Sequence, residues 1–83
     1  MDPFARTSQQ LGALIRRQRR QASLTQSQLG QKMGARQATV SKLESGEPAT
    51  RLKTLMDALA ALNLELVMRP RTKADPRSIE DLF

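Results

Sequence analysis

A pair of glycines four residues apart constrains the fold of this chain more than any other feature of its sequence. Gly30 and Gly34 fall in LTQSQLGQKMG (residues 24–34), where the apolar residues otherwise recur at helical spacing. Glycine costs about 1 kcal/mol relative to alanine inside a helix, so each glycine needs a structural reason. A close crossing of two helices needs a small residue, which Gly30 supplies, and a sharp turn needs a residue that tolerates positive φ, which Gly34 supplies. The segment therefore predicts two helices that cross after a tight turn.

The apolar residues around the glycines fit the same unit. Five of them occupy the positions at which two crossing helices bury side chains: Leu29, Met33, Ala35, Val40 and Leu43. The GxxxG spacing is also a membrane helix-dimer motif, which the surrounding Gln, Lys and Ser residues disfavour. A helix pair that serves packing alone is the other alternative, which the basic net charge disfavours.

Apolar periodicity predicts four helices along the chain, over residues 9–22, 26–33, 37–45 and about 50–62. Thr7 or Ser8 is placed to cap the first helix and Thr25 the second. The first helix is predicted to bury Leu11, Leu14, Ile15 and Ala22 and to expose a basic face of Arg16, Arg17, Arg19 and Arg20. The predicted apolar stripe of the fourth helix is Leu52, Leu55, Met56, Leu59 and Leu62.

After the fourth helix, the apolar period changes to two. Leu64, Leu66 and Met68 share one face of LELVMR (residues 64–69), which is the alternation of a strand. A strand needs a partner for its backbone hydrogen bonds, and the sequence contains no second strand pattern. The same strand of a second copy, antiparallel across a two-fold axis, supplies that partner. We therefore expect a homodimer joined through Leu64, Leu66, Val67 and Met68.

The composition excludes most enzymes and indicates a polyanionic partner. The 83 residues include no cysteine and no histidine, so the usual metal ligands and the usual general base are missing. We expect no catalytic residue, no metal site and no cofactor. The net charge of +6 lies wholly in residues 1–69, which points to nucleic acid or a membrane surface as partner. The start MDPFARTSQQ has no apolar signal core, and no apolar run is long enough to span a bilayer. These features predict a cytoplasmic protein without a membrane partner.

The segment from Leu11 to Leu62 resembles the Cro/C1-type repressors, the xenobiotic-response-element family. The resemblance covers about two thirds of the chain and rests on LTQSQLGQKMG, on KLESG and on the helix that follows. Gly30 stands where alanine is usual in that family, and the loop at residues 47–49 is short. The resemblance implies a mainly α, four-helix helix-turn-helix domain whose third helix lies in the DNA major groove.

The segments GARQATVSKLE and LNLELVMRP resemble a narrower group, the HipB antitoxins of HipBA toxin–antitoxin modules. That family implies a dimer with a lid of paired C-terminal strands, a flexible tail and a kinase-fold toxin partner, HipA. The predicted strand distinguishes this family from many phage-type repressors, which have another helix after the fourth one. We expect a repressor that autoregulates its operon and neutralises a HipA-like Ser/Thr kinase toxin. A free-standing phage-type or XRE-family repressor, and an interaction module that has lost DNA binding, are the alternatives.

The expected organisation is an arm (residues 1–6), a helix-turn-helix DNA-binding domain (7–62), a dimerising strand (63–69) and a flexible tail (70–83). The tail is rich in charge and proline but ends in an apolar cluster of Ile79, Leu82 and Phe83. This cluster is predicted to enter a pocket of the partner. The alternative is an unused, solvated end.

In this arrangement, the third helix is expected to read bases through Gln37, Ala38, Ser41 and Lys42. Gln37 can bond adenine N6 and N7, the Ala38 methyl can touch a thymine methyl, and Lys42 can reach guanine or a phosphate. The alternative for Gln37 is a surface residue without a base contact. A symmetric dimer implies a roughly palindromic operator on double-stranded DNA, with half-sites a whole number of turns apart.

Phosphate contacts are expected from Gln26, Arg36, Thr39, Ser45 and Arg17. In the resembling family, the glutamine at the position of Gln26 binds phosphate and braces the glutamine that opens the recognition helix, here Gln37. The resemblance also implies a structural role for Glu44. The run RRQRR (residues 16–20) is either a solvated helix face or a phosphate contact through Arg16 or Arg17.

Overall fold

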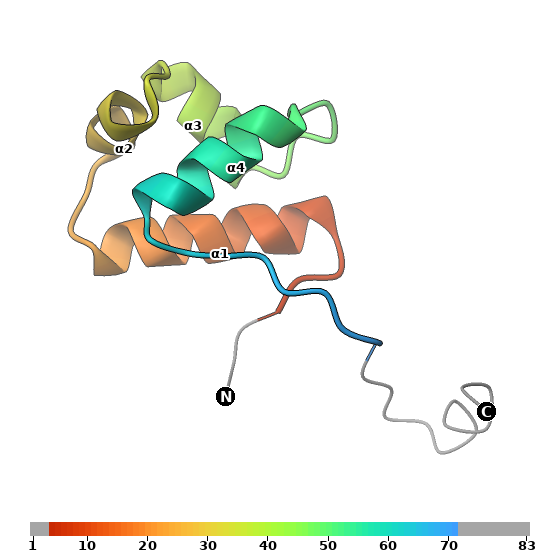
Figure 1. Ribbon diagram of the computed structural model, residues 1–83. Coiled ribbons are helices and arrows are strands. Elements are labelled where there is room, and N and C mark those ends of the chain that lie inside the picture. The colour runs from red at the N-terminus through yellow and green to blue at the C-terminus, as the bar shows by residue number, and fades with distance from the viewer. Residues whose placement is uncertain (1–3, 72–83) are drawn as a thin grey trace, which may run out of the picture.

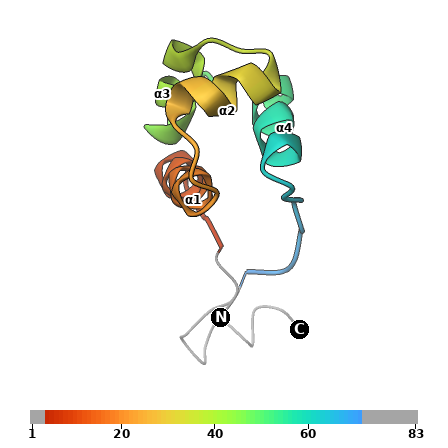
Figure 2. The ribbon, with the colours of Figure 1, turned by 90° about the vertical axis from the view of Figure 1, so that its left-hand side faces the viewer.

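The computed structural model of the chain describes residues 4–71, and these residues form four helices (Figure 1). The helices are α1 (Ser8–Gln21), α2 (Gln26–Met33), α3 (Gln37–Glu44) and α4 (Leu52–Ala61). Helix α2 packs against both α3 and α4, and α1 packs against α3. Figure 2 looks nearly along α1 and shows α2 running across it. All four predicted helices are confirmed, with ends within two residues of the predicted ones.

Local capping chemistry sets the helix ends. The Thr7 hydroxyl accepts a hydrogen bond from the Gln10 backbone N–H at 3.0 Å at the start of α1. Thr25 and Gln28 form a capping box at the start of α2, each side chain bonding the other residue's backbone N–H. Gly34 ends α2 with a φ of 70°, in the left-handed region that favours glycine. The tight turn between α2 and α3 therefore depends on Gly34, as predicted.

Gly30 allows a close approach of two backbone segments. A Cβ added at Gly30 would lie 2.7 Å from the carbonyl oxygen of Ala35, which follows the turn. The Ala35 N–H also donates to the Gly30 carbonyl at 2.8 Å. The predicted need for a small residue is confirmed, although the segment that approaches Gly30 is the backbone of the turn rather than a side chain of the second helix.

A small core lies between the helices. Within the described part of the chain, the buried apolar residues are Ile15, Leu29, Val40, Leu43, Ala58 and Leu59. Met33 and Ala35, also predicted to be buried, are only partly covered. The predicted stripe of α4 is wrong at Leu52 and Met56, which are 69% and 46% exposed, because α4 turns the face that carries Ala58 toward the core. Ala22, past the end of α1, is exposed.

The segment after α4 runs back toward the N-terminal end of α1 (Figure 1). Residues 64–71 have no regular secondary structure in the single chain. A strand that pairs only with a second copy would have no ladder in one chain, so the predicted strand and dimer stay predictions. The guanidinium groups of Arg6 and Arg69 lie 5.0 and 5.5 Å from the centre of the Phe4 ring, which joins the two ends of the described chain.

Among residues 4–71, no helix combines the length and hydropathy that a membrane span requires. The predicted partner-binding residues Ile79, Leu82 and Phe83 lie outside the described residues.

Candidate nucleic-acid interface

Helix α3 has one buried face and one exposed polar face. Val40 and Leu43 anchor the helix in the core. All four residues predicted to read bases are exposed on the same helix: Gln37, Ala38, Ser41 and Lys42. Arg36, the residue before the helix, is exposed as well. The α3 surface therefore offers amide, hydroxyl, methyl and ammonium groups together, which are the groups that read base edges in a major groove.

The remaining predicted phosphate ligands lie in different surroundings. Thr39 and Gln26 are partly buried, whereas Ser45 and Arg17 are exposed. The Ser45 hydroxyl donates its proton to the Lys42 carbonyl at 2.7 Å. Because a phosphate oxygen accepts hydrogen bonds, a contact from Ser45 would require this internal bond to be exchanged.

Gln37, the first residue of α3, is held by Gln26, the first residue of α2. Its Nε2 donates to Oε1 of Gln26 at 2.5 Å. Gln26 in turn donates from Nε2 to Oε1 of Glu44 at 3.2 Å. The bracing of Gln37 that the family resemblance implies is thus present as a direct hydrogen bond, and it continues inward to a carboxylate at the end of α3.

Glu44 is buried and paired with Arg19 of α1, and each of these residues is 8% exposed. The Arg19 Nε lies 2.6 Å from Oε2 of Glu44, and Nη2 lies 3.0 Å from Oε1. Nη1 donates to the Leu24 carbonyl at 2.8 Å, so all three guanidinium nitrogens are used. The hydrogen bonds that Arg19 donates to the Glu44 carboxylate raise the pKa of Arg19. The carboxylate is therefore structural, as the resemblance implies.

The predicted placement of Arg19 on the outer basic face is wrong. Arg19 follows the buried Ile15 by four residues, so both lie on the same side of α1. That spacing was the signal that could have identified it, but an arginine there is buried only because α3 supplies a carboxylate. The other three arginines of the run remain exposed: Arg16, Arg17 and Arg20. With Glu44 they line a shallow depression of about 470 Å³ beside the end of α3.

Gly12 of α1 also positions α3, and the sequence reasoning missed it. A Cβ at Gly12 would lie 2.5 Å from the Glu44 carbonyl oxygen and 2.6 Å from that of Leu43. The α1 backbone therefore touches the end of α3 directly. The signal was available, because a glycine inside a predicted helix needs the same explanation as Gly30.

Three comparisons with known proteins agree with this geometry. A family model for the helix-turn-helix domain matches residues 15–68. The chain is 35% identical over 71 residues to the antitoxin HipB of Escherichia coli (strain K12), covering 86% of this chain and 81% of that relative. It is 34% identical to the antitoxin HipB of Escherichia coli O6:H1, covering 86% of this chain and 76% of that relative.

Solved structures of HipB share the fold. A chain of a HipA–HipB–O2–O3 complex superposes with a TM-score of 0.77 at 30% identity, over 83% of this chain and 97% of that chain. A HipB–O4 20mer complex gives the same values. The helix-turn-helix model matches well over half of the sequence. Both relatives are antitoxins named HipB, and the match covers most of the length of each. The chain therefore belongs to the helix-turn-helix family and, within it, to the HipB antitoxins.

Proposed function

We propose that this protein is a non-enzymatic, DNA-binding antitoxin that represses its own operon and neutralises a HipA-like kinase. The observation that carries the proposal is the exposed polar face of α3, whose first side chain is braced from the core through Gln26 and Glu44. Such a helix meets the demands of major-groove reading, because a fixed side chain loses little entropy on binding a base. DNA binding would place the protein in the cytoplasm, associated with the nucleoid.

Gln37, Ala38, Ser41 and Lys42 would read the bases. Gln37 stands at the N-terminal end of α3, the end that approaches the base pairs in this docking geometry. Its amide can bond adenine, and Lys42, one to two turns along, can bond guanine or a phosphate. Arg36, Gln26, Thr39, Ser45 and Arg17 would contact the phosphates and orient the domain on the duplex.

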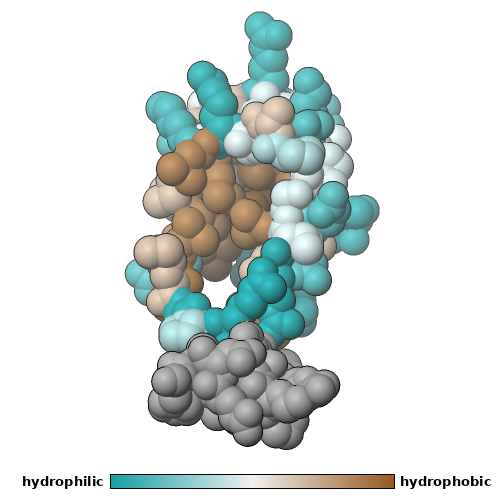
Figure 3. All heavy atoms as spheres, turned by 90° about the vertical axis from the view of Figure 1, so that its right-hand side faces the viewer, coloured by the Kyte–Doolittle hydropathy of each residue, from teal (hydrophilic) through white to brown (hydrophobic). Residues whose placement is uncertain are grey.

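A homodimer would present two such helices to a palindromic operator. Leu66, Val67 and Met68 are 51%, 75% and 97% exposed, an apolar run that a single chain leaves in water. They border a groove of about 740 Å³ whose opposite wall includes Leu11 and Leu14 of α1. Figure 3 shows apolar residues gathered in a hollow on this face, with hydrophilic residues around it. Pairing of segment 63–69 with its mate would cover this surface.

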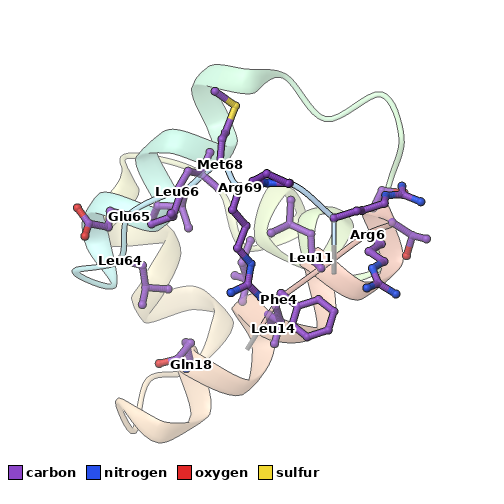
Figure 4. A pocket seen from close by; sticks show the side chains of 18 residues that line it. Phe4, Arg6, Leu11, Leu14, Gln18, Leu64, Glu65, Leu66, Met68 and Arg69 are labelled. Atoms are coloured by element: carbon purple, nitrogen blue, oxygen red, sulfur yellow. The ribbon is translucent and has the colours of Figure 1, made fainter. Parts of the chain in front are cut away.

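The close-up of the groove supports a pairing surface at the segment after α4. Figure 4 shows Met68 pointing away from α1, while Leu64 and Leu66 lie between α4 and α1. Phe4 and Arg69, which lie against each other, line the same groove as Leu14 (Figure 4). A second copy would therefore meet the outward side chains of this segment before those of the core.

The toxin partner is proposed from the relatives. One of the matched structures is a HipA–HipB–O2–O3 complex, so a related chain assembles with both HipA and O2–O3 at once. We propose that this chain does the same with a HipA-like kinase, and that Ile79, Leu82 and Phe83 in segment 70–83 contribute to that contact.

A pull-down from lysate of the native host tests the proposal. Full-length protein and a 1–71 truncation would serve as baits, with nuclease added to remove bridging DNA. Recovery of a stoichiometric kinase-fold partner is the expected result, and its loss on truncation would place the contact in the tail. Recovery of no protein partner, with operator binding intact, would instead identify a free-standing repressor.

A further inference from the structure

Four polar side chains form a continuous hydrogen-bonded series from the core to the exposed end of α3. They are, in order, Arg19, Glu44, Gln26 and Gln37. The series begins at the buried ion pair and ends at the residue proposed to read adenine. Within residues 4–71, every buried polar atom of a side chain has a hydrogen-bond partner. The buried atoms of Arg19 and Glu44 are therefore all hydrogen-bonded.

The ion pair sets the direction of every bond in this series. A carboxylate that pairs with an arginine is ionised and can only accept hydrogen bonds. Gln26 must therefore turn its NH2 toward Glu44, which leaves its carbonyl oxygen facing Gln37. Gln37 must in turn present its own NH2 to that oxygen. The orientation of both amides follows from the charge of Glu44, because the opposite orientation would place an oxygen against an oxygen.

This orientation leaves Gln37 with one free N–H and one free carbonyl oxygen. Adenine offers an acceptor, N7, beside a donor, the N6 amino group, and matches that pair. Guanine offers two acceptors, N7 and O6, which an amide with two free N–H groups could satisfy together. With one N–H already bonded to Gln26, Gln37 would set its oxygen against a guanine acceptor.

We infer that the Arg19–Glu44 pair is a specificity-determining positioning pair, which makes Gln37 prefer adenine over guanine although neither charged residue reaches the DNA. The inference rests on the proposed DNA-binding function. Gln26 transmits the effect, and its amide keeps the orientation that Glu44 imposes.

The double variant R19M/E44Q tests this inference. It removes both charges together, so that no unpaired charge stays buried, and its glutamine at position 44 can face Gln26 with either oxygen or nitrogen. The matched control is K53M/D57N, which removes the more exposed pair of Lys53 and Asp57 on α4 by replacing the base with methionine and the acid with its amide. Both variants keep the net charge of the chain, so general attraction to DNA is unchanged.

Selection from a randomised duplex library with the wild-type protein would give the operator. The base pair whose preference disappears in Gln37→Ala is the one that Gln37 reads. Competition between duplexes with adenine and with guanine at that position then gives an affinity ratio for each variant. The ratio is expected to fall about tenfold in R19M/E44Q and to stay constant in K53M/D57N. The salt dependence of binding should stay the same in both.

An unchanged ratio in R19M/E44Q, or an equal fall in the control, would overturn the inference. If circular dichroism shows R19M/E44Q to be unfolded, Gln26→Met tests the same series with the ion pair intact, against Gln31→Met as control, an exposed glutamine of the same helix. A fall in the ratio for Gln26→Met alone would support it, and no fall would overturn it. Failure of the proposed function looks different, because the wild-type protein would then select no sequence at all.

Discussion

Arg19 and Glu44 lie 25 residues apart in the sequence and form a two-bond ion pair that ties α1 to the last residue of α3. Removing one partner leaves the other charge buried without compensation. Arg19→Met and Glu44→Gln should each lower the free energy of unfolding by about 3–5 kcal/mol, measured by urea denaturation. In the double variant R19M/E44Q, the free energy of unfolding should fall by clearly less than the sum of the two single losses. A loss equal to the sum would show that the charges act independently.

Gly12→Ala should destabilise the domain although alanine is the better helix former. The gain in propensity is about 1 kcal/mol, but the new Cβ would lie 2.5 Å from a backbone oxygen of α3, which cannot move away as a flexible side chain would. The expected net loss is about 1–3 kcal/mol in the free energy of unfolding. Ala13→Gly is the control, since Ala13 is exposed on the same helix and should lose only the propensity difference.

Ser23→Gly should stabilise the protein. Ser23 follows α1 with a φ of 60°, a left-handed conformation that costs L-residues other than glycine about 1 kcal/mol. Its N–H donates to the Arg20 carbonyl, and the N–H of Leu24 donates to that of Arg19, which is the hydrogen bonding of a helix C-terminus. Glycine keeps these bonds and removes the strain. Thermal unfolding should show that the free energy of unfolding rises by about 0.5–1 kcal/mol in Ser23→Gly and does not rise in Ser23→Ala.

Gln37→Ala and Lys42→Ala should weaken DNA binding in different ways. Loss of Gln37 should cost about 1–3 kcal/mol on the operator and remove the preference at one base pair. The slope of log affinity against log salt should stay the same, because the amide carries no charge. Lys42→Ala should reduce that slope by about one if Lys42 contacts a phosphate and should relax one base preference if it contacts guanine. Fluorescence anisotropy over a salt series separates these outcomes.

Met68→Asp should convert a dimer into monomers, because Met68 is 97% exposed and points away from α1 (Figure 4). The substitution places a charge in the apolar face proposed to meet the second copy, where it would be desolvated without a partner. Sedimentation equilibrium should show half the wild-type mass, and operator affinity should fall because one recognition helix binds alone. Glu65→Gln, on the other side of the segment, is the control and should keep the wild-type mass. A wild-type protein that is already monomeric would refute the pairing of the segment.

The helices and the turn between α2 and α3 were predictable because their signals are local. Thr25, Gln28 and Gly34 each act within a few residues of chain, so the sequence contains the whole interaction. The burial of Arg19 was not predictable in the same way, because its partner Glu44 comes from a helix that only the tertiary fold brings near. A glycine inside a predicted helix did signal a close contact at Gly12, but the sequence does not say which segment makes it, since the backbone that excludes a side chain there belongs to α3.

The exposed face of α4 illustrates a different limit. The residues Leu52, Leu55, Met56 and Leu59 form a wide apolar stripe, and periodicity alone does not say which part of a wide stripe turns inward. The core takes Ala58 and Leu59 and leaves Leu52 and Met56 in water. The strand after α4 remains a prediction for a related reason, because its partner would be another molecule.

The small core has a consequence for how the folded fraction of this protein depends on its concentration. Among residues 4–71, only six apolar residues are buried, which is little apolar surface for a chain of 83 residues: Ile15, Leu29, Val40, Leu43, Ala58 and Leu59. If a second copy completes the apolar surface, the stability of the fold rises with the concentration of the chain itself. The folded fraction would then grow more steeply than synthesis does. A modest drop in synthesis would therefore cause a proportionally larger drop in the concentration of folded dimer. The folded fraction itself would then depend on how much of the protein is present.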